Sequence, residues 1–170
     1  FSHNSSNIRN MNLNPLFYTF EEWAFQIQTF FQSFILVFFV LSFIDRSVIF
    51  NFIFNSWIPL LNFVIFLYWF PLLICLICVR FTDIAQLVPI LLQLVFLISP
   101  ILYKKESLGN LSWITNFNFI FKILDPLRLS IIDGYVLYGD TFLILLINIV
   151  GLLFSFWYLD QEGKKLPFLV

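Results

Sequence analysis

Few side chains in this sequence have the types and spacing that chemistry requires. Cys75 and Cys78 form a C-x-x-C pair, a spacing that in a soluble chain would suggest zinc binding or thiol redox chemistry. Here the pair lies in an uninterrupted apolar run, and His3 is the only histidine in the chain. Two sulfurs cannot complete a tetrahedral zinc site. We therefore expect the cysteines to pack within a helix, and we assign no catalytic role to His3.

The chain also lacks the residues that usually bind nucleotides or transfer protons. The chain has only 5 glycines, and they form no glycine-rich loop of the kind that cradles phosphates. Every Asp and Glu falls at the boundary of an apolar stretch or in a connector, so no acid stands inside a span as a proton relay would need. We expect a chain that is not an enzyme and holds no cofactor or metal. Energy for any transport must come from another subunit.

The composition is that of a membrane protein. Of 170 residues, 61% are hydrophobic and 11% are charged, with 25 Phe, whereas a soluble domain is about 45–50% apolar and about 25% charged. Nine Lys and Arg against ten Asp and Glu give a net charge of −1, which lacks the basic footprint of a nucleic-acid-binding protein. The first residue is Phe1 and the only methionine is Met11, so we expect a fragment or a processed piece.

Any site in this chain must be carried by membrane-spanning helices. Such helices can be located as stretches without charged residues, because placing a charge at the bilayer centre costs at least about 2.5 kcal/mol. A helix needs about 20 residues to cross the hydrocarbon. Continuous apolar runs without alternation argue against barrel strands. The sequence predicts an all-α membrane protein, a helical bundle of about four transmembrane helices in a single domain, with spans near residues 23–44, 57–79, 84–103 and 141–159. Residues 47–56 are expected to form an interfacial connector.

Between the last two spans lies a more polar segment, residues 107–135. Apolar residues at 117, 120, 121 and 124 follow helical spacing, as in a helix that lies in the interface or enters the membrane part of the way. Asp125-Pro126 is expected to end that helix, and Leu127 to begin a second short one, before Asp133-Gly134 turns the chain. The sequence thus predicts short interfacial or re-entrant helices here.

Polar residues inside the spans repeat at helical spacing. Stripes of this kind occur at residues 26, 29, 32 and 33, at residues 86, 93 and 100, and at residues 141, 148, 151 and 155. Small and amide side chains join helices in membranes, and we expect the last stripe to be a helix contact face. For Gln86 and Gln93 a contact face and a hydrophilic path are equally open. Arg80 and Asp83 can pair across the short turn between two spans, or simply mark a membrane boundary.

One region resembles a known family. The string from Val79-Arg-Phe-Thr-Asp-Ile-Ala-Gln-Leu to Ser99-Pro-Ile-Leu-Tyr103 is similar to a region of ABC-type permeases that export cell-surface polysaccharide. Those permeases carry an R-F-x-D-[IL] turn, a span with Gln-Leu and an [ST]-P-I-x-[YW] corner. Here Arg80, Phe81 and Asp83 match the turn. The segment from Asn118 to Asp125-Pro126 and the final residues 165–169 also resemble the family, although Asp125 replaces its more usual Asn.

The resemblance implies a fold and an orientation. The four spans would be the last four of a six-span permease, with the first two missing ahead of Phe1. Residues 1–22, 80–83 and 160–170 would be cytoplasmic, and residues 45–56 and 104–140 would lie outside, with Asp125, Pro126 and Arg128 in an outer gate. The charge count gives no positive-inside bias, with four Lys and Arg inside against five outside.

The function implied is the membrane subunit of an ATP-driven exporter of lipid-linked O-antigen, capsule or teichoic acid in the bacterial cytoplasmic membrane. Its expected partners are a separate ATP-binding subunit, which would hold ATP and Mg, a second copy of itself, and membrane lipids. Arg80, Phe81 and Asp83 would receive the push of the ATPase, and Pro100 would kink its span. The candidate substrate path combines amide, hydroxyl and aromatic side chains: Gln86, Gln93, Ser99, Tyr103 and Trp113.

Two other functions stay open. Phe-rich chains of this size also occur as structural subunits of respiratory or photosynthetic membrane complexes, which need no substrate path. A permease of the same broad class could instead export drugs or lipids. Tyr103 and Trp113, taken singly, also fit ordinary aromatic anchors at a membrane interface.

Overall fold

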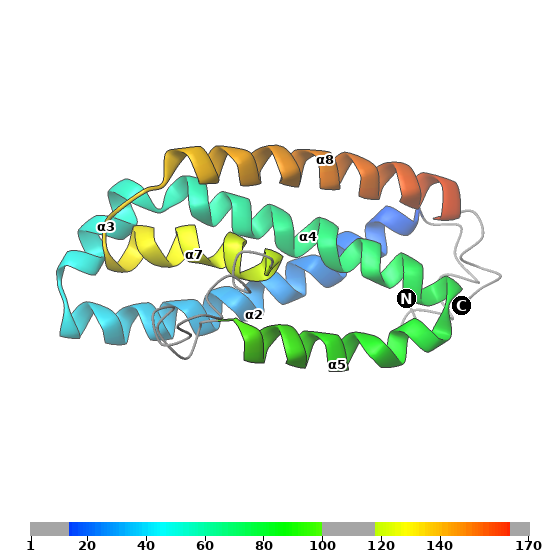
Figure 1. Cartoon of the computed structure of the whole chain (residues 1–170), viewed down its shortest axis with the longest axis horizontal. Coiled ribbons are helices and arrows are strands. Elements are labelled where there is room, and N and C mark those ends of the chain that lie inside the picture. The colour runs from blue at the N-terminus through cyan, green and yellow to red at the C-terminus, as the bar shows by residue number, and fades with distance from the viewer. Residues whose placement is uncertain (1–13, 100–117, 164–170) are drawn as a thin grey trace.

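The computed structural model describes residues 14–99 and 118–163, and these residues form six helices without a strand. Figure 1 shows them arranged as an elongated bundle. In chain order the helices are α2 (Pro15–Ile44), α3 (Ser47–Asn55), α4 (Trp57–Arg80), α5 (Thr82–Ile98), α7 (Phe119–Ile132) and α8 (Tyr138–Gly163). The all-α class predicted from the sequence is thus confirmed for the described residues.

Three of these helices, α2, α4 and α8, are long and apolar enough to cross a membrane. α5 has 17 residues, which corresponds to about 25 Å at 1.5 Å per residue, and it falls short of the length of a typical span. It ends at Ile98, before the predicted limit of residue 103. Ser99 is extended with ψ 130°, because a following proline disfavours the helical conformation. Pro100, the predicted kink, lies outside the described residues.

The first helices begin and end at identifiable residues. The side chain of Asn14 accepts a hydrogen bond from Leu16 N at 3.1 Å, and Pro15 occupies the first position of α2, where its missing N–H costs nothing. At the other end Asp45 Oδ1 accepts from Ser47 N at 2.9 Å, which starts α3. The sequence predicted a connector at residues 47–56. The chain connects α2 to α4 there through a nine-residue helix.

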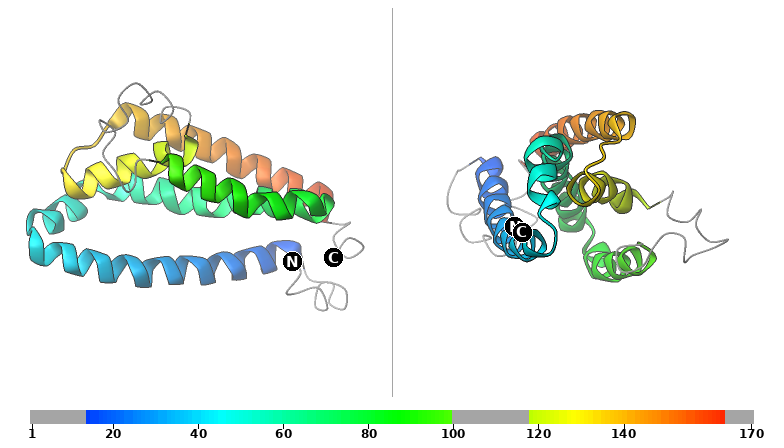
Figure 2. Two further views of the ribbon diagram at one scale, coloured as in Figure 1. Left: turned by 60° about the horizontal axis from the view of Figure 1, so that its bottom comes forward. Right: turned by 90° about the vertical axis from the view of Figure 1, so that its left-hand side faces the viewer.

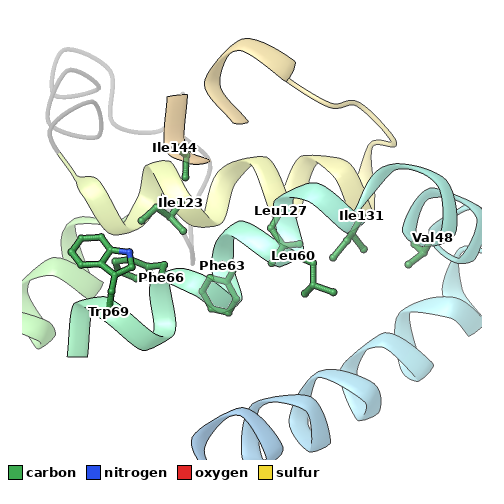
Figure 3. Close-up of a cluster of buried hydrophobic side chains, with 9 residues drawn as sticks. All are labelled: Val48, Leu60, Phe63, Phe66, Trp69, Ile123, Leu127, Ile131 and Ile144. Carbon is green, nitrogen blue, oxygen red and sulfur yellow. The ribbon is translucent and has the colours of Figure 1, made fainter. Parts of the chain in front are cut away.

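α4 is the central helix of the bundle. It contacts every other described helix, and its most extensive packing is against α8. Viewed from the α3 end (Figure 2, right), α2 and α5 lie on opposite sides of it. The larger cluster of buried hydrophobic side chains, drawn in Figure 3, joins α4 to α3, α7 and α8. Its members are Val48, Leu60, Phe63, Phe66, Trp69, Ile123, Leu127, Ile131 and Ile144.

The prediction of two short helices broken at Asp125-Pro126 is wrong. α7 is one helix of 14 residues that continues through Pro126. Proline removes one hydrogen bond of the helix and crowds the preceding turn, at a cost of about 3 kcal/mol. Pro126 is buried, and its neighbours Ile123 and Leu127 belong to the core cluster. Packing of α7 against α3 and α4 therefore outweighs the local preference for a break.

The two ends of the bundle hold different segments. At one end lie the start of α2, the turn from α4 to α5 and the end of α8 (Figure 1). A Cβ placed on Gly163 would be 3.4 Å from Pro15 Cγ, so the first and last described helices meet there. At the other end lie α3, the end of α7 and the start of α8. Segments that the family resemblance would place on one side of a membrane thus share one end.

Candidate functional site

A buried polar seam joins α4 to α8. Trp69 Nε1 donates to Asn148 Oδ1 at 2.9 Å, and Asn148 Nδ2 donates to the carbonyl oxygen of Asn62 at 2.9 Å. Asn62 Nδ2 in turn donates to the carbonyl oxygen of Thr141 at 2.9 Å. Asn148 and Ser155 have no exposed surface. The polar face of α8 is therefore a helix contact face, as predicted, and is occupied by the protein itself.

A second set of polar contacts holds α7 and the turn that follows it. Asn55 Nδ2 donates to the carbonyl oxygen of Gly134 at 2.9 Å, and Asn51 Nδ2 donates to that of Ile131 at 3.3 Å. Ser130 Oγ lies 3.2 Å from Ser56 Oγ, and both side chains are fully buried. The two asparagine bonds satisfy backbone carbonyls, one in the last turn of α7, where a helix leaves carbonyls without partners, and one in the turn that follows. They fix α7 against α3.

The motif residues of the α4–α5 turn lie at an exposed end of the bundle. Arg80 Nη1 is 3.7 Å from Glu162 Oε1 on α8, and the guanidinium stacks over the ring of Phe81 at 5.6 Å. Among the described side chains, Arg80 forms its ion pair with Glu162 and not with Asp83, contrary to the pairing considered from the sequence. Asp83 is exposed in the first turn of α5, where a carboxylate interacts favourably with the helix dipole.

The predicted substrate-path residues are only partly brought together. Gln86 and Gln93 are exposed on α5. Ser99 is buried, and its Oγ accepts a hydrogen bond from Asn118 Nδ2 at 2.6 Å. Asn118 Oδ1 caps α7 by accepting from Phe121 N at 3.1 Å, so Ser99 joins the end of α5 to the start of α7. Tyr103 and Trp113 lie outside the described residues.

The predicted gate residues share one helix but not one environment. On α7, Asp125 is half-buried, Pro126 is buried and Arg128 is exposed. In the described part of the chain, no group of three or more His, Cys, Asp and Glu side chains is placed to hold a metal ion. Cys75 and Cys78 are half-buried free thiols.

A groove of about 730 Å³ lies between α2 and α4. In Figure 2 (left) α2 runs apart from the other helices and joins them through α3. The α2 wall combines polar and aromatic side chains, namely Tyr18, Thr19, Glu22, Trp23, Gln26, Thr29, Phe30 and Ser33. The other wall comes from α4, mainly from Phe63, Leu67, Pro71, Leu72 and Cys75. A volume of this size is typical of pockets for small organic ligands, about 300–1,000 Å³.

An aromatic cluster adjoins the groove near the start of α2. The rings of Phe20 and Tyr68 stack at 4.9 Å, and Trp23 meets Tyr68 edge-on at 5.5 Å. Tyr68 Oη lies 3.2 Å from Thr19 Oγ1. The helical spacing of Gln26, Thr29 and Ser33 pointed to this wall, because residues three and four apart share a face. Nothing in the sequence pattern indicated that α4 would lie opposite.

Comparisons with protein-family models, with curated protein sequences and with solved structures found no match for this chain.

Proposed function

We propose that this chain is the membrane subunit of an ATP-driven ABC transporter that exports lipid-linked polysaccharide across the bacterial cytoplasmic membrane. It would work as a homodimer, with ATP bound and hydrolysed in a separate subunit. The observation that carries the proposal is the α4–α5 turn. Its motif residues Arg80, Phe81 and Asp83 are exposed together at one end of the bundle. The helix that follows directly, α5, carries the exposed Gln86 and Gln93.

The turn is well placed to pass on a mechanical push. Only Phe81 separates the last residue of α4 from the first of α5. Arg80 pairs with Glu162 of α8, and Gly163 meets Pro15 at the start of α2. A partner that moves this end would therefore shift several helices together, as in rigid-body switching between two arrangements of one bundle.

The exposed face of α5 supports the substrate path and the second copy. Gln86 and Gln93 are exposed and, seven residues apart, share one face of α5; α5 itself lies on the opposite side of α4 from α2 (Figure 2). Amide groups facing lipid tails find no hydrogen-bond partners, so a second copy that covers this face would give them a shared polar lumen. In this proposal α5 is a membrane span together with α2, α4 and α8. The path continues through Ser99, Tyr103 and Trp113.

α7 fits the proposed outer gate. It is a partial helix of 14 residues that packs on α3 at the end of the bundle away from Arg80. Asp125, Pro126 and Arg128 lie within it. The four helices α2, α4, α5 and α8 would correspond to the last four spans of a six-span permease, with α7 as its re-entrant element.

The first experiment is a mild-detergent pull-down of the full-length product from its native membrane, followed by mass spectrometry. We expect an ATPase with a P-loop in near-equal amount. A set of redox subunits without an ATPase would overturn the export proposal and favour a structural subunit of a respiratory or photosynthetic complex.

Point variants then test the path. Gln93→Ala is expected to lower surface polysaccharide at unchanged membrane abundance, because it removes an amide from the path. Gln32→Ala is the matched control, since Gln32 is an exposed glutamine of α2 that lies outside the groove. An equal loss of export and abundance in Gln93→Ala would reduce Gln93 to a packing role.

A further inference from the structure

The α2 wall of the groove carries a polar stripe beside the aromatic Tyr18, Trp23 and Phe30, whereas the α4 wall is mainly apolar. Glu22, Gln26, Thr29 and Ser33 follow one another at spacings of four, three and four residues, so they form a single polar stripe on α2. The stripe is about 16 Å long at 1.5 Å per residue. Across the groove, the side chains of Phe63, Leu67 and Leu72 are apolar.

Lipid tails alone are a poor filling for this groove. Polar groups that face hydrocarbon without hydrogen-bond partners are unfavourable, and the stripe lies within a helix long and apolar enough to cross a membrane. Within the stripe, Gln26 Nε2 donates to Glu22 Oε1 at 3.1 Å and Thr29 Oγ1 donates to the carbonyl oxygen of Phe25 at 3.0 Å. These bonds leave one N–H and the Oε1 acceptor of Gln26 available, and leave acceptor capacity on Thr29. A fitting occupant is polar along α2 and apolar along α4.

Two buried donors adjoin the aromatic end of the groove. Tyr18 Oη and Trp23 Nε1 find no hydrogen-bond partner among the described residues, and both side chains line the groove. Tyr18 is only 6% exposed. Because buried polar atoms in native proteins are nearly always paired, an acceptor brought in by an occupant would complete this end, after a small rotation of either side chain.

The charge of the groove selects among polar occupants. Among the described residues that line it, Glu22 is the only Asp or Glu, and there is no Lys or Arg. A phosphate group would meet an acidic side chain there and no cation. Hydroxyl groups, which both donate and accept, suit a wall of carboxylate, amide and hydroxyl side chains.

We propose that this groove binds an uncharged glycolipid, with the sugar hydroxyls against the α2 stripe and an alkyl chain against α4. The site is separate from the α5 face, which lies on the opposite side of α4. The proposal goes beyond the export function and does not rest on it, because it follows from the groove alone.

The test uses the full chain in phosphatidylcholine nanodiscs that contain equal small amounts of monoglucosyl-diacylglycerol and phosphatidylglycerol with the same acyl chains. The protein is extracted into a detergent without a sugar headgroup, and the retained lipids are counted by native mass spectrometry. We expect the glucolipid to be retained at least about tenfold over phosphatidylglycerol. Equal retention of both lipids, or preference for the anionic one, would overturn the proposal.

Matched variants tie the binding to the groove. Gln26→Leu combined with Thr29→Val is expected to abolish the preference, whereas Gln32→Leu on the same helix keeps it. Thr29→Val alone, which is close to isosteric, is expected to weaken the preference without changing the unfolding transition. Unchanged retention of the glucolipid in the double variant would refute the assignment. Cross-linking that places a second copy of the chain in the groove, in place of a glycolipid, would also refute it. Because the readout is lipid binding, failure of the export test would leave the glycolipid proposal intact.

Discussion

The indole of Trp69 and the amide of Asn148 are hydrogen-bonded at 2.9 Å across the interface between α4 and α8. Each lies in a helix long enough to cross a membrane, and Asn148 has no exposed surface. The bond is one link of a chain that also includes Asn62. Its two helices form the most extensive contact of the bundle.

Asn148→Ala is expected to destabilise the protein by about 1–3 kcal/mol, because it leaves the buried Trp69 Nε1 without a partner and removes the bond to the Asn62 carbonyl. Unfolding in mixed micelles with rising dodecyl sulfate measures the change. In a double-mutant cycle with Trp69→Phe, the coupling is expected at or below about 1.7 kcal/mol, the upper range for hydrogen bonds between membrane helices. A coupling near zero would show that the bond contributes nothing.

Gly151→Ala is expected to destabilise the same interface, because its Cβ would lie 2.7 Å from the Trp69 ring. Overpacking of this kind costs about 1–3 kcal/mol. Gly139→Ala on the same helix is the control, since its Cβ would meet nothing within 4 Å. The control should be neutral or slightly stabilising, because alanine favours helix more than glycine does. Similar unfolding midpoints for both variants would contradict the close approach.

Gly134→Ala combines two penalties that a second substitution separates. Gly134 has φ 67°, and its Cβ would lie 2.5 Å from Asn51 Oδ1. The left-handed conformation alone costs a non-glycine residue about 1–2 kcal/mol. In an Asn51→Ala background the clash is removed, and only this conformational cost is expected to remain. The same loss of stability in both backgrounds would show that the clash is relieved by movement of Asn51.

Stability at low pH should depend on Asp45, which lies between α2 and α3. The backbone hydrogen bond from Ser47 is the main cause that lowers the pKa of this carboxyl below its usual value of 3.8. A lowered pKa in the folded state gives stability that is present above the unfolded value and is lost as the pH falls through the folded one. Asp45→Asn should remove this acid dependence, measured as the unfolding midpoint against pH. A wild-type profile identical to that of the variant would contradict it.

The sequence predicted those features that depend on interactions within one helix or one turn. Uncharged stretches located the long helices, and the seven-residue spacing of Thr141, Asn148 and Ser155 identified the buried face of α8. The pattern also gave the Asp133-Gly134 turn, where Gly134 adopts a positive φ. In each case the signal lies within one helix or one turn.

Other features depended on segments distant in sequence. Asp125-Pro126 looks like a helix end, but the packing of α7 on α3 and α4 carries the helix through it. Arg80 has a candidate partner three residues away, yet it pairs with Glu162 because α8 ends beside it. The α2 stripe was visible in the sequence, whereas the α4 wall that makes it a groove was not.

The polar seam has a consequence for the order in which the bundle is assembled. Asn62 and Trp69 are synthesised 79 residues before Thr141 and Asn148, the residues whose oxygens accept from their side chains. Until α8 leaves the ribosome, α4 must therefore wait in the translocation machinery or the bilayer with an amide and an indole unmatched. Arrival of the last helix completes these bonds, so a nascent chain cut short before α8 should be the form most readily cleared by membrane proteases.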